Sequence, residues 1–176
     1  MKEIVQDGAE VLREVAAPVP EDLFGSAELA QLIASMAEAL DAEKEGVALA
    51  APQIGVSYRL FIVRKDRTLP VHPSSASQEE HSVPEVETYV NPEIVKTSRK
   101  RSAADEGCLS VRGIYGTTLR HERVTIRARR IDGSAFERGA GGLLAQIFEH
   151  EIDHLNGILF IDHAEHLIRV THEPEA

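Results

Sequence analysis

Two segments of the chain repeat apolar residues at the spacing of a helix. The first follows Ser26, whose hydroxyl can cap the first turn of a helix, and extends to Glu45, with Gly46 placed to end it. Within this segment apolar residues recur every three or four positions, at Leu29, Leu32, Ile33, Met36 and Leu40. The spacing predicts a helix from Ser26 to Glu45 that packs one face against a core.

The second segment predicts a helix that is buried rather than exposed on one side. It begins after the glycine-rich residues 139–142 and ends near Asn156, with Gly157 as its C-terminal residue. Its apolar residues occur on more than one side of a helix, at Leu143, Leu144, Ile147, Phe148, Ile152 and Leu155. A helix of this kind belongs in the middle of a domain.

Three further segments have the composition of strands. Residues 58–64 and 89–95 are rich in apolar residues, and the segment 123–132 alternates apolar with polar positions from Val124 to Arg129. Asp132 and Gly133 then predict a hairpin turn. Short strands and two helices, in an order that is not a regular βαβ repeat, favour the α+β class. We expect short mixed or antiparallel sheets packed around a central buried helix.

The rest of the chain predicts a loop and a tail within one domain. Residues from about 65 to 87 are polar and contain several prolines, which indicates a long flexible surface loop. Residues from about 168 to 176 form a short tail. The chain has 176 residues, of which 43% are hydrophobic, enough for one buried core. We therefore expect a single catalytic domain over residues 1–176.

Charge and hydropathy exclude several classes of protein. The formal net charge of -10 argues against direct binding of nucleic acid, so the basic segment from Lys96 to Arg101 is interpreted as a solvated turn. No run approaches the roughly 20 apolar residues of a membrane span, and the N-terminus lacks the apolar run of a signal peptide. The single cysteine, Cys108, cannot form an intramolecular disulfide. We expect a cytoplasmic protein without a membrane partner.

The buried helix carries the pattern H-E-x-x-H at residues 150–154. His150 and His154 are four residues apart and lie on one face of a helix, where both can bind one metal ion beside the Glu151 carboxylate. The same letters can arise by chance on a solvated helix, since the chain contains eight histidines. The setting favours a metal, because ionisable groups on a buried helix need partners.

A catalytic metal of this type commonly takes three protein ligands. One group of metalloproteases places a third histidine three residues beyond Gly157, but Phe160 stands there and cannot bind a metal. The segment that follows is too short for another ligand-bearing helix. The third ligand is therefore expected upstream, where the Cys108 thiolate would complete a Cys-His-His set with one position open to water.

Three separated segments resemble the three signature motifs of the peptide deformylases, in the same order. They are G-V-A-L-A-A-P-Q at 46–53, E-G-C-L-S at 106–110 and H-E-I-D-H at 150–154. The resemblance extends from Ile4 to about Asp162. It implies an α+β metal-dependent hydrolase that removes the formyl group from the N-terminal formylmethionine of newly synthesised proteins and releases formate.

The resemblance also implies the roles of the site residues. The metal ligands would be Cys108, His150 and His154. They would hold one divalent ion, most often Fe(II) in this family, although Zn(II), Ni(II) or Co(II) can occupy such a site. A hydroxide on the metal would attack the formyl carbon, with Glu151 as general base and then general acid. The Gln53 side chain and the backbone N–H of Leu109 would stabilise the oxyanion.

Other residues would bind substrate or support the ligands. Val47, Ile147 and the segment after Cys108 would line the pocket for the methionine side chain, although each could equally be ordinary core. Gly46 and Ala48 would also bind substrate, with the backbone at Ala48 facing it. Glu106 and Arg120 would form a pair that helps to hold the cysteine strand, although an arginine of this kind is more commonly a surface charge on a strand. Asp153 would support the site or lie on the surface, without binding the metal. The implied partners are formyl-methionyl N-termini of nascent polypeptides, with transient proximity to the ribosome.

Two positions depart from the family pattern and leave alternatives open. Ala48 replaces a glycine, and alanine adds strain if the backbone there has positive φ. Arg112 stands where proline is common, near the substrate entrance. One alternative is a metallopeptidase or amidase of other specificity. Another, motivated by Ala48, is a deformylase-like metal-binding protein with weakened turnover, but the retention of Gln53 and Glu151 argues against it.

Overall fold

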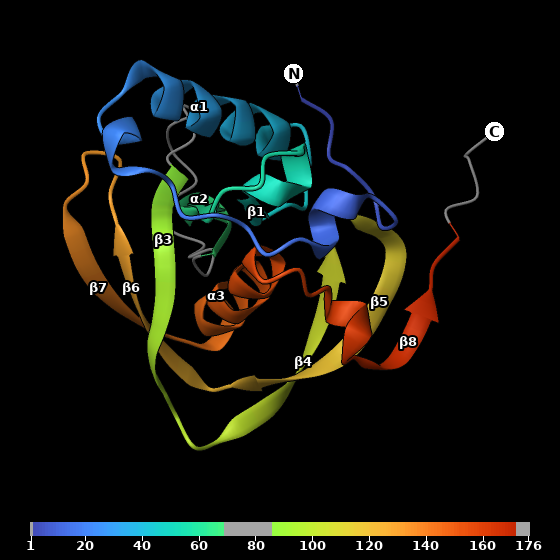
Figure 1. The fold of residues 1–176 in the computed structure, drawn as a ribbon. Helices are drawn as coiled ribbons and strands as arrows, with labels where there is room; N and C mark the ends of the chain where they lie inside the picture. The colour runs from blue at the N-terminus through green and yellow to red at the C-terminus, as the bar shows by residue number, and fades with distance from the viewer. Residues whose placement is uncertain (1, 69–85, 172–176) are drawn as a thin grey trace, which may run out of the picture.

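The computed structural model describes residues 2–68 and 86–171, and within them the strands form two antiparallel sheets (Figure 1). The five-stranded sheet has the order β1-β2-β3-β6-β7. Its strands are β1 (Ala48–Ala50), β2 (Leu60–Arg64), β3 (Val86–Thr97), β6 (Arg123–Arg129) and β7 (Ala135–Gly141). The three-stranded sheet has the order β4-β5-β8. Its strands are β4 (Arg101–Cys108), β5 (Val111–His121) and β8 (Glu165–Arg169).

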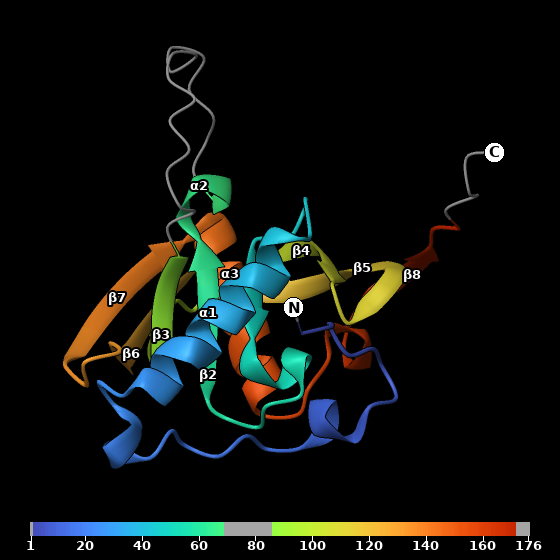
Figure 2. The same ribbon diagram turned by 90° about the horizontal axis from the view of Figure 1, so that it is seen from above.

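Helices lie on both faces of the five-stranded sheet (Figures 1 and 2). The α-helices are α1 (Ala27–Asp41), α2 (Lys65–Thr68) and α3 (Gly142–Leu155). Four short 3-10 turns complete the described helical structure: η1 (Glu10–Arg13), η2 (Glu21–Leu23), η3 (Ala51–Ile54) and η4 (Phe160–Asp162). None of the helices in the described ranges is long and apolar enough to cross a membrane.

The alternation of side chains along β2 explains this arrangement. Leu60 and Ile62 belong to the core cluster that contains α1, whereas Phe61 and Val63 belong to the cluster that contains α3. All four side chains are almost fully buried. A strand that is covered on both faces reads as a continuous apolar run, which is why residues 60–63 lack a polar position.

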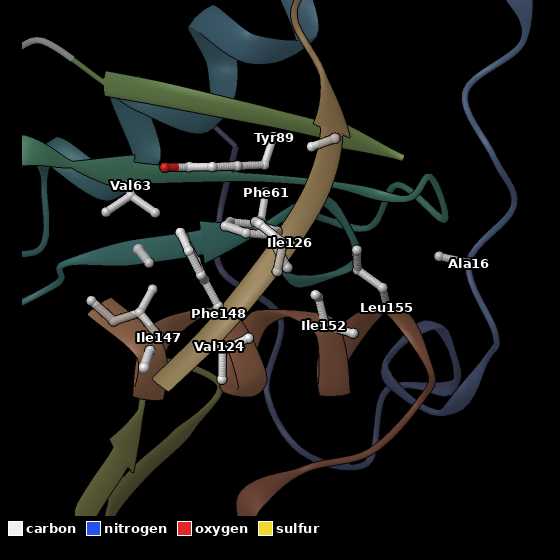
Figure 3. Packing of buried hydrophobic residues seen from close by; sticks show 14 residues of the cluster. Ala16, Phe61, Val63, Tyr89, Val124, Ile126, Ile147, Phe148, Ile152 and Leu155 are labelled. Carbon is white, nitrogen blue, oxygen red and sulfur yellow. The ribbon is translucent and has the colours of Figure 1, made fainter. Parts of the chain in front are cut away.

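Aromatic rings pack against one another in the core cluster around α3. Phe61 stacks on Tyr89 with 4.8 Å between ring centroids, and Phe148 of α3 meets Tyr89 edge-on at 5.1 Å. Figure 3 shows Phe148, Ile152 and Leu155 projecting from α3 towards the side chains of the sheet. The helix that carries residues 150–154 is thus held by packing along its length.

The structure confirms the start of the first helix and corrects its end. The Ser26 hydroxyl accepts a hydrogen bond from the backbone N–H of Leu29 at 3.2 Å, as a capping residue does. The helix ends at Asp41 rather than Glu45. The guanidinium of Arg67 donates to the carbonyl oxygens of Leu40 and Glu43, so these oxygens are satisfied without a further helical turn. The second predicted helix agrees with α3 within two residues.

The strands were predicted less completely than the helices. The segments 58–64, 89–95 and 123–132 correspond to β2, β3 and β6, of which β6 already ends at Arg129. Gly133 forms the expected turn between β6 and β7 with φ of +89°. No strand range was predicted for β1, β4, β5, β7 or β8. Of these, β1, β4, β7 and β8 contain several alanines and glycines or charged residues, and pairing with a neighbouring strand rather than intrinsic preference makes them extended.

Two predicted boundaries are wrong where the structure describes them. The loop expected at 65–87 begins with α2 and ends within β3, and its residues 69–85 lie outside the described residues. The tail expected from 168 onwards begins within β8, because Tyr115 of β5 pairs with Ile168. Residues 172–176 lie outside the described residues. The basic segment 96–101 does contain the turn from β3 to β4, at residues 98–100.

Candidate metal centre and active site

Cys108, His150 and His154 come together at the end of β4 and on one face of α3. Their candidate ligand atoms all lie within 4.8 Å of one another, and Cys108 Sγ is 3.3 Å from His154 Nε2. A sulfur and a nitrogen bound to one tetrahedral zinc ion, at about 2.3 and 2.0 Å, would lie about 3.5 Å apart. The donor set and its spacing therefore fit a single divalent ion.

The hydrogen bonds around His150 also fit a metal ligand. His150 Nδ1 lies 2.6 Å from Glu106 Oε1, which leaves the other ring nitrogen, Nε2, available to a metal ion. A carboxylate on the far nitrogen is the usual support of a metal-binding histidine. Burial by itself would lower the pKa of His150, but the Cys108 thiol and the Glu106 carboxylate outweigh it and raise this pKa. The surroundings of His150 thus favour positive charge, which a cation would supply.

Glu106 and Arg120 form a pair, as the resemblance implied, and the pair is buried rather than on the surface. Arg120 Nε donates to Glu106 Oε2 at 2.9 Å and Nη2 donates to Oε1 at 2.6 Å, and each residue is 6% exposed. Thr118 also donates its hydroxyl to Glu106. Burial raises the pKa of Glu106, but the bonds from Arg120 and His150 outweigh this and lower it. Glu106 is therefore a buried carboxylate held ionised by its partners.

Asp153 joins the same network from α3. Its Oδ2 accepts from Arg120 Nη1 at 2.7 Å and lies 3.4 Å from Nε2 of His163. Arg120 therefore links β5 both to the strand that carries Cys108 and to the helix that carries the histidines. This places Asp153 beside the ligand-supporting pair and not among the ligand atoms.

Gln53 is fixed at both ends of its amide. Its Oε1 accepts from the backbone N–H of Ala50 at 2.9 Å, and its Nε2 donates to Ser110 Oγ at 3.1 Å and lies 3.7 Å from Cys108 Sγ. The side chain is buried, and these contacts direct its N–H groups to the cysteine end of the site. Leu109, between Cys108 and Ser110, lines the same cavity.

Two partners in this region were not singled out from the sequence. Ser110 is fully buried, accepts from Gln53 and donates its backbone N–H to Cys108 Sγ at 3.4 Å. Its place in the segment E-G-C-L-S was a usable signal. Thr118 had no signal, because only the register of β4 against β5 brings it to Glu106.

Glu151 lies deep in the site beside the ligand group. Its Oε2 is buried and has no hydrogen-bond partner among the described residues. Burial raises the pKa of Glu151 to about 7. A carboxyl group with such a pKa can both accept and donate a proton near neutral pH. An unpaired buried oxygen is also costly unless water or a ligand satisfies it.

The cavity in front of these residues has a volume of about 630 Å³ and runs between two segments of the chain. One wall is residues 43–48 and the other is residues 105–109 and 111–115, and Ile147, His150 and Glu151 of α3 also line the cavity. The predicted pocket residues all line it: Gly46, Val47, Ala48 and Ile147. The methionine pocket itself stays a prediction.

The expected strain at Ala48 is absent. Ala48 is not among the described non-glycine residues with positive φ, which are Asn91 and His166. Its side chain is 7% exposed and belongs to the core cluster around α3. Alanine therefore fits the strand without strain and contributes packing, so the main argument for a weakened enzyme is removed.

Phe160, which occupies the ligand position of the metalloprotease pattern, is buried against the site. Its ring stacks on that of His150, with 6.3 Å between the centroids and an interplanar angle of 26°. It shields the histidine from one side and cannot coordinate.

Comparison with known proteins agrees with this geometry. The family model described as "Polypeptide deformylase" matches residues 1–170. A peptide deformylase of Carboxydothermus hydrogenoformans is 37% identical over 166 residues, which cover 94% of this chain and 95% of the relative. An actinonin-bound class I type b peptide deformylase from Acinetobacter baumannii superposes with a TM-score of 0.79 at 33% identity, over 93% of this chain and 98% of the other. A Met-Ala-Ser-bound structure of that protein gives 0.77 at 33% identity, over 91% and 96%.

Proposed function

Since the chain belongs to the polypeptide deformylase family and removes the N-formyl group from newly made polypeptides, we propose that it does so with one divalent metal ion held by Cys108, His150 and His154. The observation that carries this proposal is the convergence of their ligand atoms within 4.8 Å. When bound, the ion would act as a Lewis acid that lowers the pKa of a water molecule. Fe(II) is the ion we propose, with Zn(II), Ni(II) or Co(II) as substitutes. The metal-binding part of α3 thus forms the centre of the site.

Glu151 moves the proton in this proposal. Its carboxyl group has a pKa near 7 and an unpaired oxygen in the cavity, so it can take a proton from the attacking water and pass it to the departing amine. Glu106 and Arg120 hold His150 in the tautomer that leaves Nε2 free to bind the metal.

The oxygen of the formyl group becomes negatively charged during attack and needs hydrogen-bond donors. We assign this role to the Gln53 amide and the backbone N–H of Leu109, which both line the cavity next to Cys108. Because Ala50 and Ser110 already fix the Gln53 amide, little reorganisation is required as the charge develops.

The two edges of the cavity suit an extended peptide. β1 and β4 are edge strands of the two sheets, and both line the cavity. The carbonyl of Val47 accepts from Arg64 of β2, so by the alternation of an antiparallel strand the N–H and C=O of Ala48 face the cavity. A formyl-methionyl N-terminus would bind there as an added strand, with Val47 and Ile147 against the methionine side chain. We propose that such N-termini are met near the ribosome.

The test is formate release by the metal-loaded protein under anaerobic conditions, with formyl-Met-Ala-Ser and acetyl-Met-Ala-Ser compared. The proposal expects formate from the first peptide and no acetate from the second. Cleavage of both peptides would instead favour an amidase of broader specificity. A fully metal-loaded protein that cleaves neither would contradict the proposal and favour a deformylase-like protein without turnover.

A further inference from the structure

An ion pair joins the two walls of the substrate cavity. Arg112 of β5 donates from Nη2 to Glu43 Oε1 at 2.7 Å and from Nη1 to Oε2 at 3.2 Å. Glu43 lies in the segment between α1 and β1, and both residues line the cavity. The Glu43 side chain is 24% exposed and that of Arg112 is 54% exposed, so the guanidinium covers the carboxylate.

The wall that contains Glu43 is also anchored from its other side. Arg67 of α2 donates from Nη1 to the backbone carbonyls of Glu43 and Gly46, each at 2.6 Å. Glu43 is therefore held by its main chain to α2 and by its side chain to β5. The hydrogen bond from Arg112 lowers the pKa of Glu43, so the carboxylate stays ionised at neutral pH.

The two walls also approach each other next to this pair. A Cβ atom at Gly46 would lie 3.1 Å from Cδ1 of Leu109, which leaves no room for a larger residue without movement. The backbone of Ala48, which faces the cavity, is only two residues beyond Gly46. A shift of the wall at Glu43 would therefore move the main-chain groups that an extended peptide uses.

We propose that Glu43 and Arg112 are positioning residues that set the width of the cavity for the part of the substrate that follows the methionine. The inference rests on the proposed function. The methionine and its formyl group bind nearer the metal centre, so a substrate without further residues does not depend on this pair. A longer peptide depends on it through the main chain of the wall, because small displacements weaken several hydrogen bonds at once.

The experiment compares KM and kcat for formyl-Met-Ala-Ser and for formyl-methionine amide, using the metal-loaded full chain. The variants are Glu43→Gln, Arg112→Met and the two combined. Breaking a partly exposed pair is expected to raise KM for the tripeptide about three- to fivefold. KM for the single-residue substrate and kcat for both should stay within about twofold. The combined variant should be no worse than either single one, because one interaction is lost in all three.

Two further variants separate positioning from a general structural effect. Arg127→Met breaks an exposed pair of the same type, to Glu137 at 2.8 Å, and should leave both substrates unaffected. Exchange of the charges, Glu43→Arg with Arg112→Glu, should restore most of the tripeptide KM. The inference is overturned if the tripeptide KM is unchanged, if both substrates are affected equally, or if the exchanged pair restores nothing. A wild-type protein that releases no formate would instead overturn the proposed function.

Discussion

At the scale of single residues, Arg120 is the group on which the buried charges of the site depend. It is 6% exposed and satisfies two carboxylates, those of Glu106 and Asp153. Removal of one partner of a buried pair leaves the other charge without compensation, and that loss exceeds anything an exposed pair contributes.

Replacement of Arg120 by methionine should therefore lower the free energy of unfolding by about 3–5 kcal/mol. The matched change Arg127→Met, in a pair whose side chains are 56% and 53% exposed, should lower it by less than about 1 kcal/mol. Urea denaturation of the metal-free proteins measures both values. Equal losses in the two variants would show that burial of the Glu106–Arg120 pair is not what makes it important.

A second residue-scale prediction concerns Ala48, whose φ is not positive and whose methyl group is in the core. Its replacement by glycine should lower the free energy of unfolding by about 0.5–1 kcal/mol, because glycine is more flexible in the unfolded chain and packs less well. Formate release should not increase. A gain in both stability and kcat would mean that alanine is strained at this position after all.

The sequence could identify site residues only where metal-binding or acid–base residue types occur at a recognisable spacing. His150, Glu151 and His154 could be recognised from their spacing on one helix. Cys108 became a candidate because Phe160 excludes a ligand at the downstream position, and the resemblance to a family then favoured it; nothing local to it shows that β4 ends beside α3. Thr118 could not be predicted, since its contact with Glu106 follows from a strand register that becomes known only with the structure.

At the scale of elements, α3 is held at its C-terminal end by the N-terminal segment of the chain. Gly157 follows the helix with φ of +73°, and a Cβ atom there would lie 2.5 Å from the backbone oxygen of Arg13. Gly55 has a similar φ of +79° but would meet nothing within 4 Å. Both glycines adopt a left-handed backbone conformation, but only Gly157 has backbone atoms of another segment close to the position of a Cβ atom.

The changes Gly55→Ala and Gly157→Ala separate these two effects. The first should cost about 1–2 kcal/mol, the strain of a left-handed backbone without glycine. The second should cost clearly more, because the backbone of Arg13 must move as well. Thermal denaturation of both variants supplies the comparison. If Gly157→Ala were no worse than Gly55→Ala, the close approach of Arg13 to the end of α3 would be unimportant for stability.

Helices and strands differ in how well the sequence predicts them. A helix that buries a regular apolar stripe, such as α1, is visible in periodicity, but its end depends on Arg67 of a distant segment. The strands β4 and β7 are weakly apolar, and they are ordered by β5 and β6, their partners in the sheets. Tertiary pairing thus decides the elements that local preference leaves open.

At the scale of the whole molecule, an ion pair links the N-terminal segment of the chain to η4, which follows α3. Arg13 Nη1 donates to Asp162 Oδ2 at 2.6 Å and Nη2 donates to Oδ1 at 3.1 Å. The hydrogen bond from Arg13 lowers the pKa of Asp162 in the folded protein. In the unfolded chain an aspartate has a pKa of about 3.9. The folded state therefore gains stability from this group above that pH.

The difference in the free energy of unfolding between the wild type and Asp162→Asn should consequently depend on pH. It should be fully present above about pH 5 and disappear as the pH falls through the lowered pKa of the folded state. Because the Asp162 side chain is 37% exposed, the difference should not exceed about 1 kcal/mol. Urea denaturation from pH 2.5 to 7 measures it. A difference that grows towards low pH would contradict the assigned direction of the shift.

The central claim is that three side chains hold the metal while a fourth moves the proton. The most direct measurement is the metal content of purified Cys108→Ala and Glu151→Gln proteins beside the wild type, determined together with formate release from formyl-Met-Ala-Ser. We expect about one metal ion per chain and formate release from the wild type, loss of the metal from Cys108→Ala, and retained metal without turnover in Glu151→Gln. Full metal content in Cys108→Ala, or wild-type turnover by Glu151→Gln, would contradict the account.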